Sequence, residues 1–220
     1  MTKAIIIMAK VPRAGNVKTR LRSLLDSEQA AEFAECLLDD TIKKVKSLNN
    51  QLIIAFSPEN ELGFFDKFLL SETFFIEQKG SDLGEKMFNA FEFAFRQNLD
   101  AVVMIGTDSP TFPPEFIEQA FEFLENSDAV LGKTSDGGFY LIGLRRLQKE
   151  IFTGIEWSSE KTFEQTKKNI LRTGFKLEET SDWYDVDLPQ DLEKLSKDFE
   201  QNEFSRRIAP KTFQWLKANL

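Results

Sequence analysis

Residues 101–112 read AVVMIGTDSPTF, and this stretch decides the class of fold. Its first five residues are apolar without a break, as in a strand of a parallel sheet that is buried on both faces. Asp108 follows, and a carboxylate next to a buried strand must be paired or solvated because burying it alone is costly. Aspartate oxygens suit Mg²⁺ or Mn²⁺ held jointly with substrate phosphates. The alternative is a simple turn residue before Pro110.

Short apolar runs alternate with longer amphipathic stretches along the rest of the chain, which predicts repeated βα units. The expected strands are 3–9, 52–56, 74–77, 101–105, 129–132 and 139–144. The expected helices are 27–48 (with Ser27 as N-cap), 59–69, 83–98, 113–124, 161–173, 188–198 and 210–218. With no internal repeat or linker, residues 1–220 are predicted to form a single three-layer α/β/α domain with a mostly parallel sheet. Ligands of such sheets bind at the carboxyl ends of the strands.

The apolar side chains themselves predict how the core is built. The sequence contains 22 phenylalanines, which indicates a core that depends on aromatic packing. Met87, Phe91, Ala94 and Phe95 recur at helical spacing, and we interpret this stripe as core and not as a ligand box.

Composition excludes several classes of function. The net charge of −8 and pI near 4.9 argue against nucleic-acid binding, because the surface repels a phosphate backbone. The chain has no histidine, which excludes histidine triads and histidine-ligated zinc. Cys36 is the only cysteine, which fits a reducing cytoplasm. The apolar run near the N-terminus is too short for a membrane span, so we expect a cytoplasmic protein.

The loop after the first expected strand, residues 10–21, reads KVPRAGNVKTRL. It concentrates four cations, Lys10, Arg13, Lys18 and Arg20, on an acidic protein, which favours contact with phosphate oxygens. Gly15 allows the backbone to approach a ligand closely. The loop is no Walker motif, because Val17 stands where that motif requires glycine. A solvated basic loop is the alternative.

Three other loops carry polar residues at the expected ligand edge. Residues 80–87, GSDLGEKM, open a helix whose start could receive an anion or a base. Residues 136–138, DGG, fit either a tight turn or a close approach to a ligand. Asp185 and Asp187 lie on the same side of an extended segment, where both could approach one metal ion or one could cap the following helix.

Taken together, these loops resemble the nucleotide-diphospho-sugar transferase superfamily of glycosyltransferase-A type. Within it the chain is similar to the bacterial DUF2064 family, a glycosyltransferase-like group related to 2-phospho-L-lactate guanylyltransferase. The matching motifs are KVPRAGNVKTRL, KGSDLGEKM, GTDSPTFP, DGGFYLIGL, Trp157-Ser158-Ser159 and DVDLPQDL, which occur in the family's order. The chain departs from the pattern at Lys86, where arginine is usual, and at Leu188 and Gln190, where threonine and glutamate are usual.

The resemblance implies a role for each matching residue. It makes Lys18 and Asp108 the catalytic residues. It makes Asp108 the main ligand of Mg²⁺ or Mn²⁺ and Asp187 the second, with Asp185 as the alternative to Asp187. It makes Lys10, Arg13, Gly15, Lys18, Arg20, Gly80, Asp82, Leu83 and Gly84 contacts to the nucleotide and its phosphates. It places Gly137, Gly138 and Tyr140 beside a small-molecule acceptor.

Three functions stay open on the sequence. The first is a metal-dependent transferase with a nucleotide-activated donor, glycosyltransferase-like as the family label suggests. The second is a nucleotidyltransferase, in which a phosphorylated small molecule displaces pyrophosphate from a nucleoside triphosphate. The single central carboxylate of Thr107-Asp108-Ser109, where many glycosyltransferases carry Asp-x-Asp, favours this second class. The third is a nucleotide-binding protein without catalysis.

Overall fold

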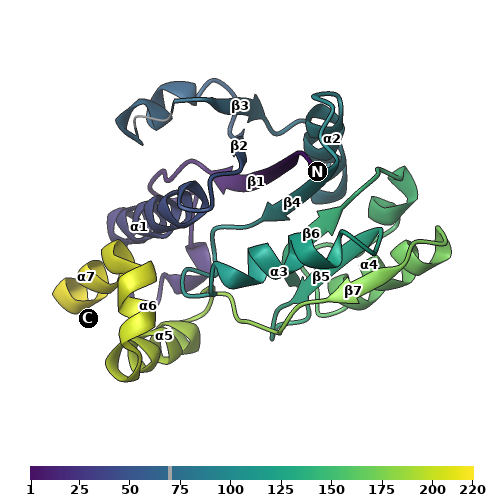
Figure 1. Ribbon diagram of the computed structural model, residues 1–220. Coiled ribbons are helices and arrows are strands. Elements are labelled where there is room, and N and C mark those ends of the chain that lie inside the picture. The colour runs from purple at the N-terminus through teal and green to yellow at the C-terminus, as the bar shows by residue number, and fades with distance from the viewer. Residues whose placement is uncertain (69–70) are drawn as a thin grey trace.

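The computed structural model describes residues 1–68 and 71–220 and shows one twisted sheet with helices on both faces (Figure 1). The strands are β1 (Lys3–Lys10), β2 (Gln51–Ser57), β3 (Thr73–Glu77), β4 (Ala101–Ile105), β5 (Ala129–Lys133), β6 (Phe139–Leu144) and β7 (Leu177–Glu179). The α-helices are α1 (Ser27–Lys46), α2 (Leu83–Phe95), α3 (Glu115–Phe123), α4 (Thr162–Arg172), α5 (Pro189–Gln201), α6 (Glu203–Ile208) and α7 (Pro210–Asn219). Three 3₁₀ helices are also described, η1 (Thr19–Leu21), η2 (Leu62–Phe68) and η3 (Lys149–Phe152).

The strand order in the described residues is β3-β2-β1-β4-β6-β5-β7. All neighbouring pairs are parallel except those of β6, which runs antiparallel to β4 and to β5. The prediction of a mostly parallel sheet is therefore confirmed. The reversed direction of β6 matters for the site, because its amino end meets the carboxyl ends of β1 and β4 at one edge.

Alternate residues of the strands build two cores. Ile5 and Ile7 of β1 face the core beneath α1, α3 and η2, whereas Ala4 and Ile6 face the core beneath α2, α4 and η3. The strands read as continuous apolar runs because both faces are covered. The predicted aromatic core is confirmed, since Phe33, Phe65, Phe91, Phe112, Phe163 and Phe199 are all fully buried.

A third apolar cluster fixes α5 and α7 against α1, and Figure 1 shows α7 in yellow beside α1. The ring of Trp215 lies 5.1 Å from that of Phe33. Asp40 of α1 accepts hydrogen bonds from the backbone of Lys211 and Thr212 at 3.1 and 2.8 Å and from the Thr212 hydroxyl at 2.8 Å. The carboxylate of one helix thus caps the amino end of another.

Several boundaries differ from the expectations. Asp26, and not Ser27, caps α1, because its side chain reaches the amides of Glu28 and Gln29. The expected helix 59–69 is the 3₁₀ helix η2 in its described part, and its last residue lies outside the described residues. The expectations omitted β7 and α6, because both are short and β7 is largely polar, so neither shows a clear apolar period.

Among the helices of the described residues, none combines the length and the apolar character that crossing a bilayer requires.

Replacing Asp40 by alanine should lower the free energy of unfolding by about 1–2 kcal/mol, because two amides at the start of α7 lose their acceptor. Chemical denaturation measures this. Asp39→Ala is the matched control. Within residues 1–68 and 71–220 the side chain of Asp39 has one ion pair, with Lys43 at i,i+4, and its loss should cost no more than about 0.5 kcal/mol. Equal losses in the two variants would contradict the capping role.

Candidate active site

A cleft of about 690 Å³ opens at the edge of the sheet where β1 and β4 end and β6 begins. Its walls come from the loop after β1, the loop after β4, the first turn of α2, the β5–β6 turn and residues 157–159 and 185–187. Parallel strands bring loops that are distant in sequence to one edge, which is why these segments meet.

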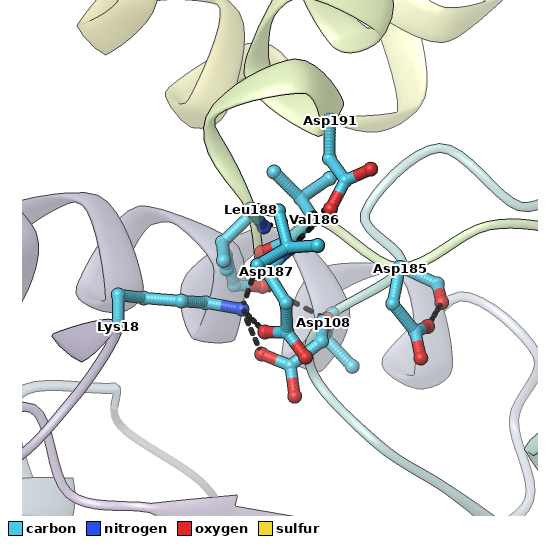
Figure 2. A network of polar contacts seen from close by, with 10 residues as sticks. Lys18, Asp108, Asp185, Val186, Asp187, Leu188 and Asp191 are labelled. Atoms are coloured by element: carbon cyan, nitrogen blue, oxygen red, sulfur yellow. Dashed lines mark hydrogen bonds and ion pairs between the residues drawn. The ribbon is translucent and has the colours of Figure 1, made fainter. Parts of the chain in front are cut away.

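Lys18 lies at the centre of the charged part of the cleft (Figure 2). Its ammonium donates hydrogen bonds to Asp108, to Oδ1 of Asp187 at 3.0 Å and to the carbonyl of Val186 at 2.8 Å. The side chain is only 5% exposed. Burial lowers the pKa of Lys18, but the charges of Asp108 and Asp187 outweigh burial and raise it overall. Lys18 therefore stays charged.

The loop after β1 reaches this position by a sharp turn. Gly15 has φ +80°, and the amide of Asn16 donates to the carbonyl of Arg13 at 3.0 Å. The ammonium of Lys10 donates to the carbonyl of Asn16 at 2.6 Å, so the loop closes on itself. Lys18 itself adopts φ +46°, which is strained for a side-chain-bearing residue and is held here by its three acceptors.

The loop that carries Asp108 is fixed from two sides. The amide of Val186 donates to the Asp108 carbonyl at 2.9 Å, which ties the two acidic segments together. From α1, the buried ammonium of Lys44 donates to the carbonyls of Pro110 and Phe112 at 2.8 and 2.9 Å. Burial lowers the pKa of Lys44 to about 7, with Asp40 opposing the shift.

Asp185 and Asp187 have different environments although they lie two residues apart. Asp187 binds Lys18, whereas Asp185 accepts a hydrogen bond from the hydroxyl of Ser109. Burial and then the charge of Asp108 raise the pKa of Asp185 to about 7. Neither residue caps α5: Asp191 does so, accepting from the amides of Asp187 and Leu188 at 3.1 and 2.7 Å (Figure 2).

Ten of the expected site residues line the cleft and five do not. Those that line it are Lys10, Lys18, Arg20, Asp82, Leu83, Asp108, Gly138, Tyr140, Asp185 and Asp187. Those outside its lining are Arg13, Gly15, Gly80, Gly84 and Gly137. Arg13 instead forms an ion pair with Glu61.

Two of the glycines are required for packing. A Cβ at Gly84 would lie 2.6 Å from the Phe152 carbonyl and 2.7 Å from the Trp157 ring. A Cβ at Gly137, where φ is +91°, would lie 2.2 Å from the Glu160 carbonyl oxygen. The absence of a side chain at both glycines therefore allows the segment that contains Trp157 to pack closely against them.

Tyr140 was expected beside an acceptor, but its hydroxyl is committed elsewhere. It bonds the Thr180 hydroxyl at 2.9 Å and the carbonyl of Ser181 at 2.9 Å, and neither residue lines the cleft. Burial raises the pKa of Tyr140 to about 12, so it stays protonated.

The expectations assigned no role to several residues that line the cleft, among them Gln78, Lys86, Asp136, Trp157 and Ser158. Lys86, Asp136, Trp157 and Ser158 belong to quoted motifs, so the motifs located them without indicating their function. Gln78 follows the end of β3, and its position after a strand was the only signal in the sequence.

The donor set fits a divalent metal that the substrate helps to bind. Asp108 and Asp187 are 46% and 37% exposed, and the second oxygen of each makes no hydrogen bond within residues 1–68 and 71–220. In those same residues no group of three or more acidic or cysteine side chains could hold a metal ion. Two carboxylates suit Mg²⁺ completed by water and phosphate oxygens, and not a cage made by protein alone.

A family described as "Uncharacterized protein conserved in bacteria (DUF2064)" matches residues 41–159, more than half of the chain. The chain belongs to the DUF2064 family. The expected resemblance is thus confirmed.

Two similar proteins extend the match beyond these residues. The DUF2064 chain is 32% identical to a presumed nucleotide-diphospho-sugar transferase from Desulfovibrio desulfuricans, with a TM-score of 0.91 over 100% of this chain and 96% of that one. It is 27% identical over 184 residues to 2-phospho-L-lactate guanylyltransferase from Methanocaldococcus infernus, covering 82% of this chain and 79% of that protein.

A more distant structure shows the same fold. A cytidylyltransferase from Leptospira borgpetersenii is 14% identical, with a TM-score of 0.57 over 100% of this chain and 95% of that one. The expected nucleotide-diphospho-sugar transferase type of α/β fold is therefore confirmed for the DUF2064 chain.

Replacing Asp185 by asparagine should change how stability depends on pH. Because the pKa of Asp185 in the folded state is about 7, the folded protein keeps a proton between about pH 4 and 7 that the unfolded chain releases. Stability from this group is present at pH 4 and is lost as the pH rises to 7. The variant should be more stable than the wild type at pH 8, by about 4 kcal/mol, and equal near pH 4.

Urea unfolding in EDTA at several pH values measures the difference. Asp182→Asn, at an exposed aspartate, is the control and should show no such trend. A difference between Asp185→Asn and wild type that does not vary with pH would contradict the shift.

Replacing Lys18 by methionine should leave Asp108 and Asp187 without their shared cation. We expect a loss of about 1–3 kcal/mol in unfolding free energy, because removing one partner leaves the other charges uncompensated. Millimolar Mg²⁺ should restore more stability to this variant than it adds to the wild type. Thermal unfolding with and without Mg²⁺ measures this, with Lys46→Met, at an exposed position outside the cleft lining, as control. An unchanged response to Mg²⁺ would argue against the two carboxylates as ligands.

Proposed function

We propose that this chain is a nucleotidyltransferase that joins a nucleoside monophosphate unit, taken from a triphosphate, to a phosphorylated small molecule. The chain is a transferase, as its relatives are, and the proposal concerns which group it transfers. The observation that carries it is the ion-paired cluster of Lys18, Asp108 and Asp187 in one cleft with Lys10 and Arg20.

The cations would hold the triphosphate. Lys10, Lys18 and Arg20 come from one loop and line the cleft together, so they can offset the charge of several phosphate oxygens. The amino end of α2 is already capped by the carboxylate of Asp82, which accepts from the amide of Glu85 at 2.8 Å, so the loop cations and Lys86 would supply the charge for the phosphates.

The reaction breaks one bond and forms one. A phosphate oxygen of the acceptor attacks the α-phosphorus, the bond from that phosphorus to the α,β-bridging oxygen breaks, and pyrophosphate leaves with the electron pair. Charge builds up on the phosphoryl and leaving oxygens, so fixed cations beside them lower the barrier. Lys18 is placed to do this because Asp108, Asp187 and the Val186 carbonyl fix its ammonium.

A divalent cation would be held by Asp108 and Asp187 and would neutralise phosphate charge when bound. Both carboxylates come from loops at the same edge as the basic loop, so the metal and the cations would act on one phosphate chain. Asp185 would not be a ligand in this arrangement, because burial and the charge of Asp108 raise its pKa to about 7 and so favour its neutral form, whereas Asp108 and Asp187 face Lys18 as carboxylates.

Two observations favour nucleotidyl over glycosyl transfer. Asp108 stands alone between Thr107 and Ser109, without the second carboxylate of an Asp-x-Asp pair. The relative from M. infernus, matched over most of both chains, is a guanylyltransferase by name.

Glycosyl transfer from a nucleotide-sugar is the second candidate. The observation that favours it is the structure from D. desulfuricans, which carries the name of a nucleotide-diphospho-sugar transferase. The two reactions differ in product: nucleotidyl transfer releases pyrophosphate, and glycosyl transfer releases a nucleoside diphosphate.

Purified protein with Mg²⁺, each nucleoside triphosphate and a panel of phosphorylated acceptors should release pyrophosphate. Asp108→Asn should lower the rate by about 10²–10³-fold, because the metal and Lys18 lose a charged partner. Asp66→Asn, at an exposed position outside the cleft, should stay near the wild-type rate. Release of nucleoside diphosphate from nucleotide-sugars, with no pyrophosphate from any triphosphate, would favour the second candidate.

A further inference from the structure

The cations of the cleft are confined to one part of its lining, which also carries Asp82, Asp108 and Asp187. These cations, Lys10, Lys18, Arg20 and Lys86, come from the loop after β1 and the first turn of α2. The lining residues supplied by 134–142, 157–162 and 185 contain no lysine or arginine. We call this second set the distal half; its charged members are Asp136 and Asp185.

Asp136 is the exposed acid of the distal half. It lies in the turn between β5 and β6, which the antiparallel direction of β6 brings to the same edge as Asp108. Its Oδ1 accepts from the Thr134 hydroxyl at 2.6 Å and from the amide of Gly138 at 3.0 Å. Its Oδ2 has no hydrogen bond and the side chain no ion pair within residues 1–68 and 71–220. One oxygen is thus fixed and the other remains an available acceptor.

Aromatic rings form another part of the distal half. Trp157 packs edge-on against Phe139, with ring centroids 6.4 Å apart, and both line the cleft. The close approach of Gly84 and Gly137 to residues 152–160 fixes this segment. Ser158, which is exposed, lines the same half.

This combination suits one class of group. An aromatic surface favours contact with the C–H groups of a ring or chain, and a carboxylate oxygen accepts hydrogen bonds from hydroxyls. A carboxylate on the bound molecule would face Asp136 without a cation from the distal half to compensate it, and like charges brought together without water repel strongly.

We propose that the distal half accepts an uncharged, polyhydroxylated part of the acceptor and excludes a carboxylate, with Asp136 as a specificity-determining residue. The inference rests on the proposed function in one respect, since it takes the acceptor's phosphate to lie at the cations and the remainder in the distal half. If the distal half excludes a carboxylate, the acceptor of this chain is not a phosphorylated carboxylic acid.

Two matched pairs of acceptors test it. Glucose 1-phosphate and glucuronic acid 1-phosphate differ only by a hydroxymethyl group in place of a carboxylate, and so do glycerol 3-phosphate and 3-phosphoglycerate. Pyrophosphate release is measured with each triphosphate and Mg²⁺. Binding of the same four compounds is measured by calorimetry with a non-hydrolysable α,β-methylene triphosphate. The hydroxymethyl member of at least one pair should be preferred by tenfold or more.

Variants assign the preference to Asp136. Asp136→Asn keeps a side-chain oxygen that can accept the hydrogen bond from the Gly138 amide, but it removes the negative charge. The preference for the hydroxymethyl compound over its carboxylate partner should therefore fall several-fold. Asp136→Lys should favour the carboxylate member. Glu160→Gln, an exposed neighbour outside the cleft lining, should keep the wild-type preference. Thermal unfolding of each variant shows that it is folded.

The outcomes separate the two proposals. Absence of pyrophosphate with every acceptor, together with tenfold tighter binding of a hydroxymethyl member, would overturn the nucleotidyl reaction and support the distal half as described. Preference for the carboxylate members, equal preference, or no binding of any of the four would overturn the inference about Asp136. A wild-type preference retained in Asp136→Asn would overturn it as well.

Discussion

The ammonium of Lys18 joins the loop after β1, the loop after β4 and the segment before α5. A buried ammonium is tolerated only beside compensating charge, and two close carboxylates need a cation between them. Asp108 and Asp187 meet that requirement from positions 90 and 169 residues away in sequence. The charged part of the cleft depends on this cluster, because Lys18 contacts all three of the segments that form it.

The helices support the same cluster from beneath. Lys44 on α1 holds the carbonyls that follow Asp108, and its neighbour on the same helix, Asp40, caps α7. Tyr184 links the Thr111 hydroxyl at 3.0 Å to Asp198 of α5, also at 3.0 Å. The C-terminal helices are therefore connected to the loop of Asp108 by polar contacts as well as by the apolar cluster around Phe33 and Trp215.

Two glycines of the motifs have a packing role that the sequence did not predict. Gly84 and Gly137 stand in motifs that suggest contact with nucleotide and acceptor, yet the lack of a side chain serves close packing against residues 152–160. These glycines let Trp157 and Ser158 border the cleft, and so they shape the half in which Asp136 is the exposed charge.

The sequence by itself determined the layers, the single sheet and the edge that carries the site, because uninterrupted apolar runs alternate with amphipathic helices and Asp108 ends the most apolar strand. It also determined that Lys18 and the two late aspartates lie at that edge. It could not give the direction of β6, since a buried strand has the same pattern in either direction. The spacing did not separate Asp187 from Asp185, which share one side of an extended segment, and only the resemblance placed Asp187 first. Only the tertiary structure showed that Asp187 contacts Lys18 and Asp185 contacts Ser109, because the environment of a carboxylate is set by neighbours that are distant in sequence.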